Sequence, residues 1–297
     1  MGDREREVTM QRTVQTALVL LVLIVAAVFA GCTGMPGLET TEEFNRTVPV
    51  EPGSAVTVIN RNGGVSVNAW EEDYVAVTAV KRTPYGRAEL EKVRIEVTKG
   101  DPLRIETVHT GLNPQVNVKY TISLPPTVVL QRAVTSNGPI DLAGVRVNGT
   151  ELRTSNGPVR VDGARGGDIA AASSNGGIEV RGAEGYITAR TSNAGITVEE
   201  SGGVLELQTS NGPISASIPA TRGDVAITTS NGAIALRLAE SLNVRVVATT
   251  SNGRIAVNDL PLLLDESSGT RVSGTLGDGG PTIAVTTSNG GIDLSGL

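Results

Sequence analysis

The hexapeptide TSNGPI at residues 135–140 and its seven relatives decide the fold of this chain. The relatives are TSNGPV (154–159), SSNGGI (173–178), TSNAGI (191–196), TSNGPI (209–214), TSNGAI (229–234), TSNGRI (250–255) and TSNGGI (287–292). Their asparagines are Asn137, Asn156, Asn175, Asn193, Asn211, Asn231, Asn252 and Asn289, at steps of 19, 19, 18, 18, 20, 21 and 37 residues. A unit that returns at a nearly fixed spacing is the signature of a stacked repeat architecture.

The two ends of the repeat region are less regular. The last step of 37 residues is nearly twice the others and predicts a degenerate coil around residues 267–269. A weaker copy, NRNGGV, stands at residues 60–65.

Alternation within each repeat predicts two strands. After the bend, Ile140 and Leu142 flank the variable Asp141, and the same apolar–variable–apolar order follows every asparagine. Before the bend, Thr150 and Leu152 are two residues apart and are expected to point to the same, inner side. The threonine and the asparagine of the bend continue this alternation and are also expected to point inward. Such period-2 patterns are typical of strands with one buried face.

Two half-buried strands in about 18 residues cannot close a core alone, but stacked coils about 4.8 Å apart can. We therefore predict an all-β, single-stranded parallel β-helix, or β-solenoid, with coils of about 18–20 residues across residues 131–297. Ten or so coils would form a rod about 45–50 Å long. Whether its cross-section has two faces or three stays open.

The Asn-Gly pair of each bend is expected to supply a left-handed backbone conformation, which other residues resist. Stacked asparagine amides can also form hydrogen bonds along the column. We interpret the eight asparagines as a structural bend ladder; a repeated ligand contact is the alternative.

Residues 44–130 are predicted to form a strand-rich N-terminal cap with the first irregular coils. Their alternating stretches indicate five or six strands, with a hairpin turn at residues 99–102. This part holds the single tryptophan, Trp70, and the single histidine, His109, which is expected to be a surface residue. The chain stops at Leu297, five residues after Ile292, so the C-terminal coil is expected to be less protected and open to weak self-association.

Residues 1–31 are interpreted as a signal peptide or a membrane-anchor helix, because residues 13–31 are predominantly apolar and follow Arg4, Arg6 and Arg12. Phe29-Ala30-Gly31-Cys32 resembles the lipobox of prokaryotic lipoproteins, which implies cleavage before Cys32 and lipid on its sulfur. The alternative is an uncleaved anchor. Residues 32–43 are predicted to be a tether. Either reading places the remaining chain on the outer side of the cytoplasmic membrane or envelope of a prokaryote.

The run NGGVSVNAWEEDYVAVTAVK (62–81), followed by repeated TSNGxI units, resembles the DUF4097 family of "putative adhesin" domains over about residues 44–297. The resemblance implies a β-helical, envelope-associated protein of bacteria or archaea. It brings no catalytic residue.

Composition narrows the function classes. The chain has 25 basic and 31 acidic residues and no basic block, so nucleic acid is not expected as a partner. One cysteine excludes an intrachain disulfide, and one histidine with that cysteine cannot form an ordinary zinc site. The repeat also lacks the aspartate of calcium-binding nonapeptides. We expect no metal and no cofactor.

An enzyme is the least favoured class. Three charged residues stand at the same position of successive repeats, four residues after the asparagine: Asp141, Arg160 and Glu179. We interpret this column as a ladder of alternating charge. The alternative is a carbohydrate-active β-helix enzyme using the two carboxylates, but the column has no aromatic platform for a sugar.

The favoured function is a non-enzymatic, adhesin-like surface lipoprotein whose repetitive face binds a cell-surface glycan or protein through many weak contacts. The alternative is an envelope sensing or scaffolding module that binds another exported protein or self-associates through its C-terminal coil. Asn45 and Asn148 head N-x-[ST] triplets and are candidate glycosylation sites.

Overall fold

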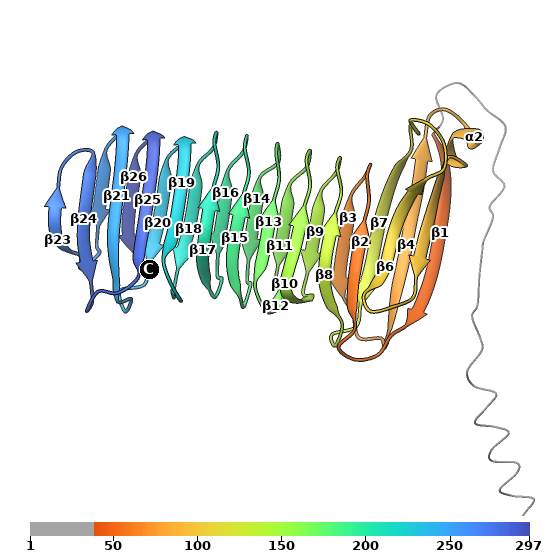
Figure 1. Cartoon of the computed structure of the whole chain (residues 1–297), viewed down its shortest axis with the longest axis horizontal. Coiled ribbons are helices and arrows are strands. Elements are labelled where there is room, and N and C mark those ends of the chain that lie inside the picture. The colour runs from red at the N-terminus through yellow and green to blue at the C-terminus, as the bar shows by residue number, and fades with distance from the viewer. Residues whose placement is uncertain (1–38) are drawn as a thin grey trace, which may run out of the picture.

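The computed structural model describes residues 39–297, which form two long β-sheets facing each other along a rod (Figure 1). The predicted signal or anchor segment, Cys32 and the first part of the tether lie outside the described residues. Among the described helices, none has the length and apolar character needed to cross a membrane.

The first sheet, sheet A, has 12 strands. In spatial order they are β1 (Thr40–Pro49), β4 (Tyr74–Thr83), β7 (Asn117–Leu124), β3 (Val65–Ala69), β9 (Ile140–Ala143), β11 (Val159–Asp162), β14 (Ile178–Arg181), β16 (Ile196–Glu199), β18 (Ile214–Ile218), β20 (Ile234–Leu238), β26 (Ile292–Gly296) and β22 (Ile255–Asn258).

The second sheet, sheet B, has 14 strands, including the two-residue β12 (Arg165–Gly166), which pairs with β10. The others in spatial order are β23 (Leu263–Ser267), β24 (Arg271–Leu276), β21 (Val244–Asn252), β25 (Thr282–Asn289), β19 (Val225–Asn231), β17 (Gly203–Gln208), β15 (Tyr186–Arg190), β13 (Ile169–Ala172), β10 (Arg146–Arg153), β8 (Val129–Val134), β2 (Ala55–Ile59), β6 (Leu103–His109) and β5 (Val93–Thr98).

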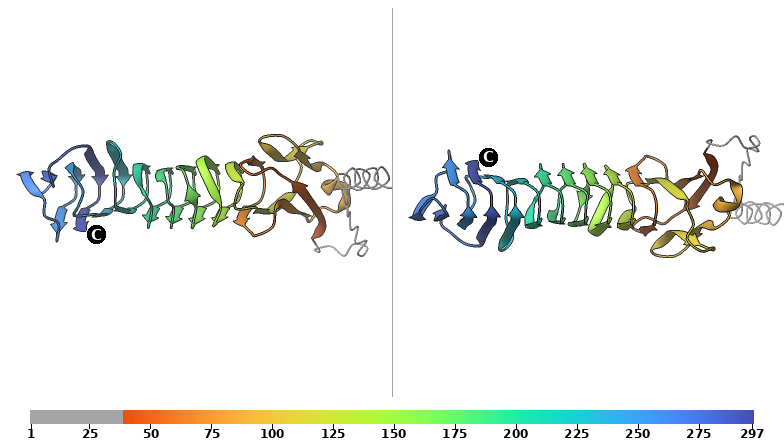
Figure 2. Two further views of the ribbon diagram at one scale, coloured as in Figure 1. Left: turned by 90° about the horizontal axis from the view of Figure 1, so that it is seen from below. Right: turned by 90° about the horizontal axis from the view of Figure 1, so that it is seen from above.

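Each coil gives one strand to each sheet, so the cross-section has two faces (Figure 2). Successive coils pair in parallel and in register: Val159 lies between Ile140 and Ile178. The predicted all-β class and parallel stacking are confirmed. Sheet B passes through the predicted boundary at 130/131 without a break, because β8 spans it.

Buried hydroxyls tie each bend to the coil before it. The threonine or serine two residues before each asparagine donates a hydrogen bond of 2.9–3.0 Å to the backbone carbonyl of the residue after the preceding asparagine. The donors, in stacking order, are Thr135, Thr154, Ser173, Thr191, Thr209, Thr229, Thr287 and Thr250. A hydroxyl is tolerated in an apolar interior only when it is bonded in this way.

The expected inward parity of the asparagines is wrong. All eight predicted ladder asparagines are exposed, because the chain bends directly after the buried threonine and turns the next two side chains outward. Their expected left-handed backbone is also wrong, since none of them has a positive φ.

The glycine of the bend is needed for close backbone approach. A Cβ at Gly176 would lie 1.8 Å from the carbonyl oxygen of Gly157, and one at Gly157 would lie 2.1 Å from that of Gly138. Ala194 is the exception at this position. The left-handed conformation instead occurs at the opposite bend, seven residues after an asparagine, at Gly144, Gly163, Gly182, Glu200 and Asp259.

The C-terminal coil does not end the rod. Strand β25 lies between β19 and β21, and β26 lies between β20 and β22. The last segment of the chain is therefore inserted between two coils that are consecutive in sequence (Figure 1). Ile292 is 2% exposed and Leu294 is fully buried. The prediction that this coil is an open end of the rod is wrong, whereas self-association of the chain stays a prediction.

The 37-residue step contains a hairpin and no degenerate coil, which corrects the prediction for residues 267–269. Strands β23 and β24 are antiparallel and extend sheet B beyond β21. Leu260 and Leu262, which precede the hairpin, pack against the core. The hairpin and the residues before it therefore cover the end of the rod, which was predicted to be less protected.

At the other end, antiparallel strands form the predicted cap. Strands β1, β4 and β7 extend sheet A, β5 and β6 extend sheet B, and the one-turn helix α2 (Arg87–Leu90) lies beyond them. The predicted hairpin turn at 99–102 joins β5 to β6. The tether prediction is too long, because β1 starts at Thr40 and Glu42 forms an ion pair of 2.6 Å with the buried Lys81.

We expect Thr154→Val to lower the free energy of unfolding by about 1–3 kcal/mol, because it leaves the half-buried carbonyl of Gly138 without its donor. Chemical denaturation of the full-length chain measures this loss. Thr197→Val, on the outer face of sheet A, is the matched control and should change stability by less than about 0.5 kcal/mol. Equal effects of the two changes would show that the buried hydroxyl contributes nothing.

We expect Gly176→Ala to lower the free energy of unfolding by about 1–3 kcal/mol, because the added methyl group overlaps the preceding coil. Gly223→Ala has no heavy atom within 4 Å of the new Cβ and should be nearly neutral. The same denaturation experiment compares them. A neutral Gly176→Ala would refute the close approach of the coils.

Candidate binding surfaces

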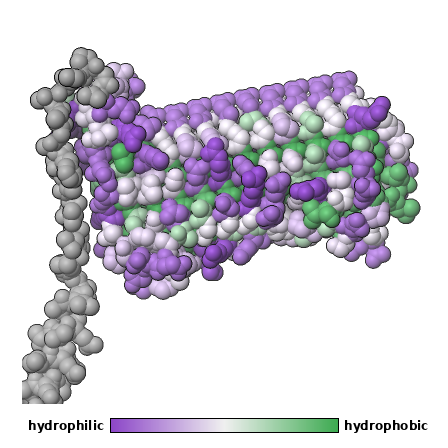
Figure 3. Space-filling view, turned by 180° about the vertical axis from the view of Figure 1, so that it is seen from behind, coloured by the Kyte–Doolittle hydropathy of each residue, from purple (hydrophilic) through white to green (hydrophobic). Residues whose placement is uncertain are grey.

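The outer side of the TSNG bends forms one continuous polar edge. We call it the Ser/Asn edge; in stacking order its pairs are residues 136–137, 155–156, 174–175, 192–193, 210–211, 230–231, 288–289 and 251–252. All sixteen side chains are exposed. Figure 3 shows the edge as an unbroken hydrophilic row along the top of the rod.

A chain of amide hydrogen bonds runs along this edge. Each asparagine donates from Nδ2 to Oδ1 of the preceding coil, over 2.6–3.1 Å. The series starts at Asn62 of the NRNGGV copy and ends at Asn252, after passing through Asn289. The predicted bend ladder is thus present, with one more member and a different order.

The ladder leaves half of its bonding capacity to solvent. An asparagine amide has two N–H donors and an oxygen with two lone pairs, and one donor and one lone pair bond the neighbouring coils. The remaining groups, with the serine hydroxyls beside them, recur once per coil, about every 4.8 Å. The edge can therefore form the same hydrogen bonds with a ligand many times over.

The charged column on sheet A is stacked as predicted. Arg160 faces Asp141 and Glu179 in register, and its Nη1 lies 3.1 Å from Oδ1 of Asp141. Glu179 instead contacts Arg181 at 3.0 Å, and Arg181 also reaches Glu199 at 3.3 Å. The carboxylates and guanidinium groups of this face neutralise one another.

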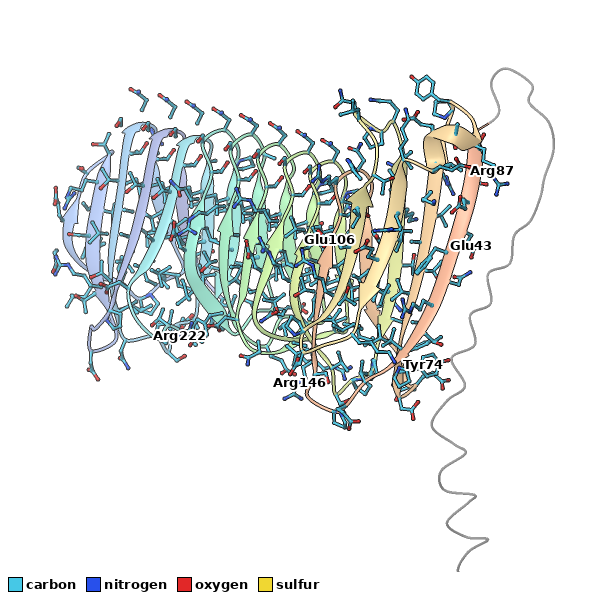
Figure 4. The ribbon with its side chains drawn as sticks, turned by 45° about the vertical axis from the view of Figure 1, so that its right-hand side comes forward. Glu43, Tyr74, Arg87, Glu106, Arg146 and Arg222 are labelled. Atoms are coloured by element: carbon cyan, nitrogen blue, oxygen red, sulfur yellow. The ribbon has the colours of Figure 1, made fainter. Side chains whose placement is uncertain are left out.

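A second charged cluster lies on the edge opposite to the Ser/Asn edge, where Figure 4 shows Arg222. Arg222 forms an ion pair with Asp168 and stacks over the ring of Tyr186, 4.5 Å from its centroid. Asp168 also accepts a 3.0 Å hydrogen bond from the backbone N–H of Tyr186. These bonds outweigh the desolvation of Asp168 and lower the pKa of its carboxyl. The contacts join three coils and are satisfied internally.

An open pocket of about 550 Å³ lies where the first coil meets the cap. It is lined by Arg61, His109, Gly111, Leu112, Asn113, Pro114 and Gln115. The pKa of His109 is lowered, first by burial and then by the positive charge of Arg61. His109 was expected to be a plain surface residue; the structure places it at the end of β6, half-buried in this pocket.

Apolar surface gathers at the end of the rod formed by β23, seen at the right of Figure 3. Leu263 is 75% exposed and Leu264 is 48% exposed, both on the edge strand β23. Asp265 and Glu266 of the same strand pair with Arg245 and Arg271. This edge strand is short and charged, which limits non-specific strand addition.

The remaining predicted site residues are separate from these surfaces. Asn45 on β1 and Asn148 on β10 are both exposed, as glycosylation sites must be. Cys32 lies outside the described residues. Within residues 39–297, no cluster of three or more histidine, cysteine or acidic side chains could hold a metal ion.

The pocket is the feature that sequence reasoning missed. The sequence does contain one indication of it: Arg61 occupies the position that serine holds in the eight TSNG copies. The partner His109 comes from a different strand, and only the fold brings the two together.

Comparisons with known proteins give distant structural neighbours. A "putative adhesin" from Bacteroides fragilis is 10% identical, with a TM-score of 0.39, over 86% of this chain and 97% of that chain. A "putative lipid binding protein" from Parabacteroides distasonis is 13% identical, with a TM-score of 0.37, over 87% and 97%. A "putative cell adhesion protein" from Clostridium sporogenes is 11% identical, with a TM-score of 0.24, over 86% and 100%.

No curated protein matches the chain significantly. The sequence model of the Toastrack DUF4097 family, in contrast, matches residues 55–295, which include the first coil and the cap strands β4–β7 and reach into the C-terminal strand β26. The expected family is therefore confirmed: this chain belongs to the Toastrack DUF4097 family.

Proposed function

We propose that this protein is a non-enzymatic binding module on the outer side of a prokaryotic envelope, and that its Ser/Asn edge binds a surface glycan. The observation that carries the proposal is the edge itself: eight exposed Ser-Asn pairs in one line, each with unused hydrogen-bonding groups. Hydroxyl and amide groups are suitable partners for sugar hydroxyls, which both donate and accept.

The affinity would come from repetition. A single hydrogen bond to a sugar hydroxyl exchanges a bond with water and contributes about 0.5–1.5 kcal/mol. Nine asparagines in a row span about 38 Å, so one extended ligand can contact several coils at once. Linked weak contacts raise the overall affinity by mass action. The rigid amide ladder holds the contacts in place before binding, which reduces the entropy cost.

The arrangement of carboxylates supports a non-enzymatic role. Asp141 is paired with Arg160, and Glu179 is paired with Arg181. Both column carboxylates are thus engaged by arginine side chains, whereas glycoside cleavage needs one carboxyl group free to act as a general acid. The column therefore serves coil stacking in our proposal.

A protein partner is the second candidate, favoured by one observation. Leu263 and Leu264 expose apolar surface at the end of the rod, which fits an exported protein or a second copy. In this version the protein is a scaffolding or sensing module.

Both versions include attachment of the chain to the membrane, either by lipid on Cys32 or by a helix.

The glycan proposal predicts that the exported part, residues 33–297, is retained on columns of purified cell-envelope glycan. Ser155→Glu with Ser192→Glu should abolish most of this retention, because both charges project from the edge and obstruct an extended ligand. The measurement is the retained fraction at constant ionic strength.

Ala170→Glu with Ala226→Glu is the matched control. It adds the same two charges to exposed positions on the outer face of sheet B, away from the edge. The control should bind like the wild-type chain. Equal loss in both variants, or no retention of the wild-type chain on any envelope glycan, would contradict a glycan-binding edge; Leu264→Asp would then test the protein alternative.

A further inference from the structure

We propose that the pocket between the first coil and the cap binds an anionic oxygen group, a carboxylate or a phosphate, through Arg61 and His109. This site is separate from the Ser/Asn edge and does not depend on the glycan proposal. It is defined by the open volume of about 550 Å³ and by its two basic side chains, Arg61 and His109.

Arg61 has the charge and the freedom to bind such a group. The ion pairs of the described residues do not include Arg61, so its guanidinium is not neutralised within this part of the chain. The planar guanidinium can donate two parallel hydrogen bonds to one carboxylate or phosphate. Its side chain is exposed and stands in the serine column of the edge.

The backbone of Arg61 is held firmly by the next coil. Its carbonyl oxygen accepts hydrogen bonds from the backbone N–H groups of Ser136 and Asn137, at 3.0 and 2.9 Å. The adjacent Asn62 accepts the amide bond of Asn137 at 2.6 Å. The cation is therefore presented from a rigid element, as an effective binding site requires.

The opposite wall of the pocket is fixed by the cap. Thr83 donates a 2.7 Å hydrogen bond to the carbonyl oxygen of Gln115, and Glu89 accepts a 2.7 Å bond from the backbone N–H of Gln115. Asn113 has a positive φ of 42°, an uncommon conformation for a residue other than glycine. Leu112 is 90% exposed and offers an apolar contact to the rest of a ligand.

The charges around His109 favour an anion. Arg61 is the charged group that perturbs the pKa of His109, and the nearby Glu89 is already paired with Lys92 at 2.7 Å. Glu106, further along β6, is paired with Arg104 at 2.8 Å. An empty pocket thus has an excess of positive charge, and this charge disfavours the protonated imidazole. A bound anion reverses that effect and raises the pKa of His109.

His109 reports on its own pocket because it is the only histidine in the chain. Full-length protein made without a histidine tag and labelled with ¹³C and ¹⁵N on histidine gives one set of imidazole signals. We would titrate it with glucuronate and with glycerol 3-phosphate at constant ionic strength. Glucose and glycerol are the uncharged controls. A response to one anion alone identifies the group as carboxylate or phosphate.

The proposal predicts a saturable shift of the His109 signals with at least one of the anions and a rise of its pKa by about one pH unit. Arg61→Ala should weaken binding at least about tenfold. Arg254→Ala, at the far end of the edge, is the matched control and should bind normally.

No saturable shift with either anion, or equal shifts in the wild-type chain and Arg61→Ala, would overturn the proposal. Without an anion, the His109 signals of Arg61→Ala should differ from those of the wild-type chain only by the effect of the lost charge. This agreement shows that the variant is folded. The Ser155→Glu and Ser192→Glu changes lie outside the pocket, so failure of the glycan experiment leaves this one intact.

Discussion

The hydrogen bond from a buried threonine hydroxyl to a backbone carbonyl of the preceding coil is the interaction on which the rest of the structure depends. It recurs from Thr135 to Thr250 at 2.9–3.0 Å and fixes the distance and register of adjacent bends. Tight spacing excludes a Cβ at positions such as Gly176. It also brings the outward asparagine amides of adjacent coils within hydrogen-bond distance, 2.6–3.1 Å from nitrogen to oxygen. The exposed ladder is therefore a consequence of the buried one.

This division of labour explains how one short motif can serve both folding and binding. The threonine and the glycine of TSNG satisfy the interior, while the serine and the asparagine form the exterior. The edge gains regularity from the core and needs no pocket of its own. At the junction with the cap, the repeat changes: Asn60 replaces the threonine and bonds Gly63 and Val118, and Arg61 replaces the serine. A distinct chemistry is expected where the pattern is broken.

Much of the fold could be predicted from local sequence. Alternation around residues such as Ile140 and Leu142 indicated the strands, and the spacing of the asparagines indicated the stack. The order of the coils could not be predicted, because the unit at Asn289 is nearly identical to those at Asn231 and Asn252 and fits beside either. The direction of the asparagines was wrong because parity does not continue through a bend. The pocket was missed because Arg61 and His109 meet only in the folded chain.

Stacking order is the most direct test of the account, because the amide and hydroxyl ladders pass through the C-terminal coil. In a Cys32→Ser background, Ala235→Cys with Asp293→Cys places two thiols on directly paired residues of β20 and β26. Neighbouring strands lie about 4.8 Å apart, within disulfide reach. Ala235→Cys with Ala256→Cys spans two strand spacings, because β26 lies between them. Oxidation should cross-link the first pair and leave the second free. Cross-linking of the second pair without the first would contradict the inserted coil and the ladders built on it.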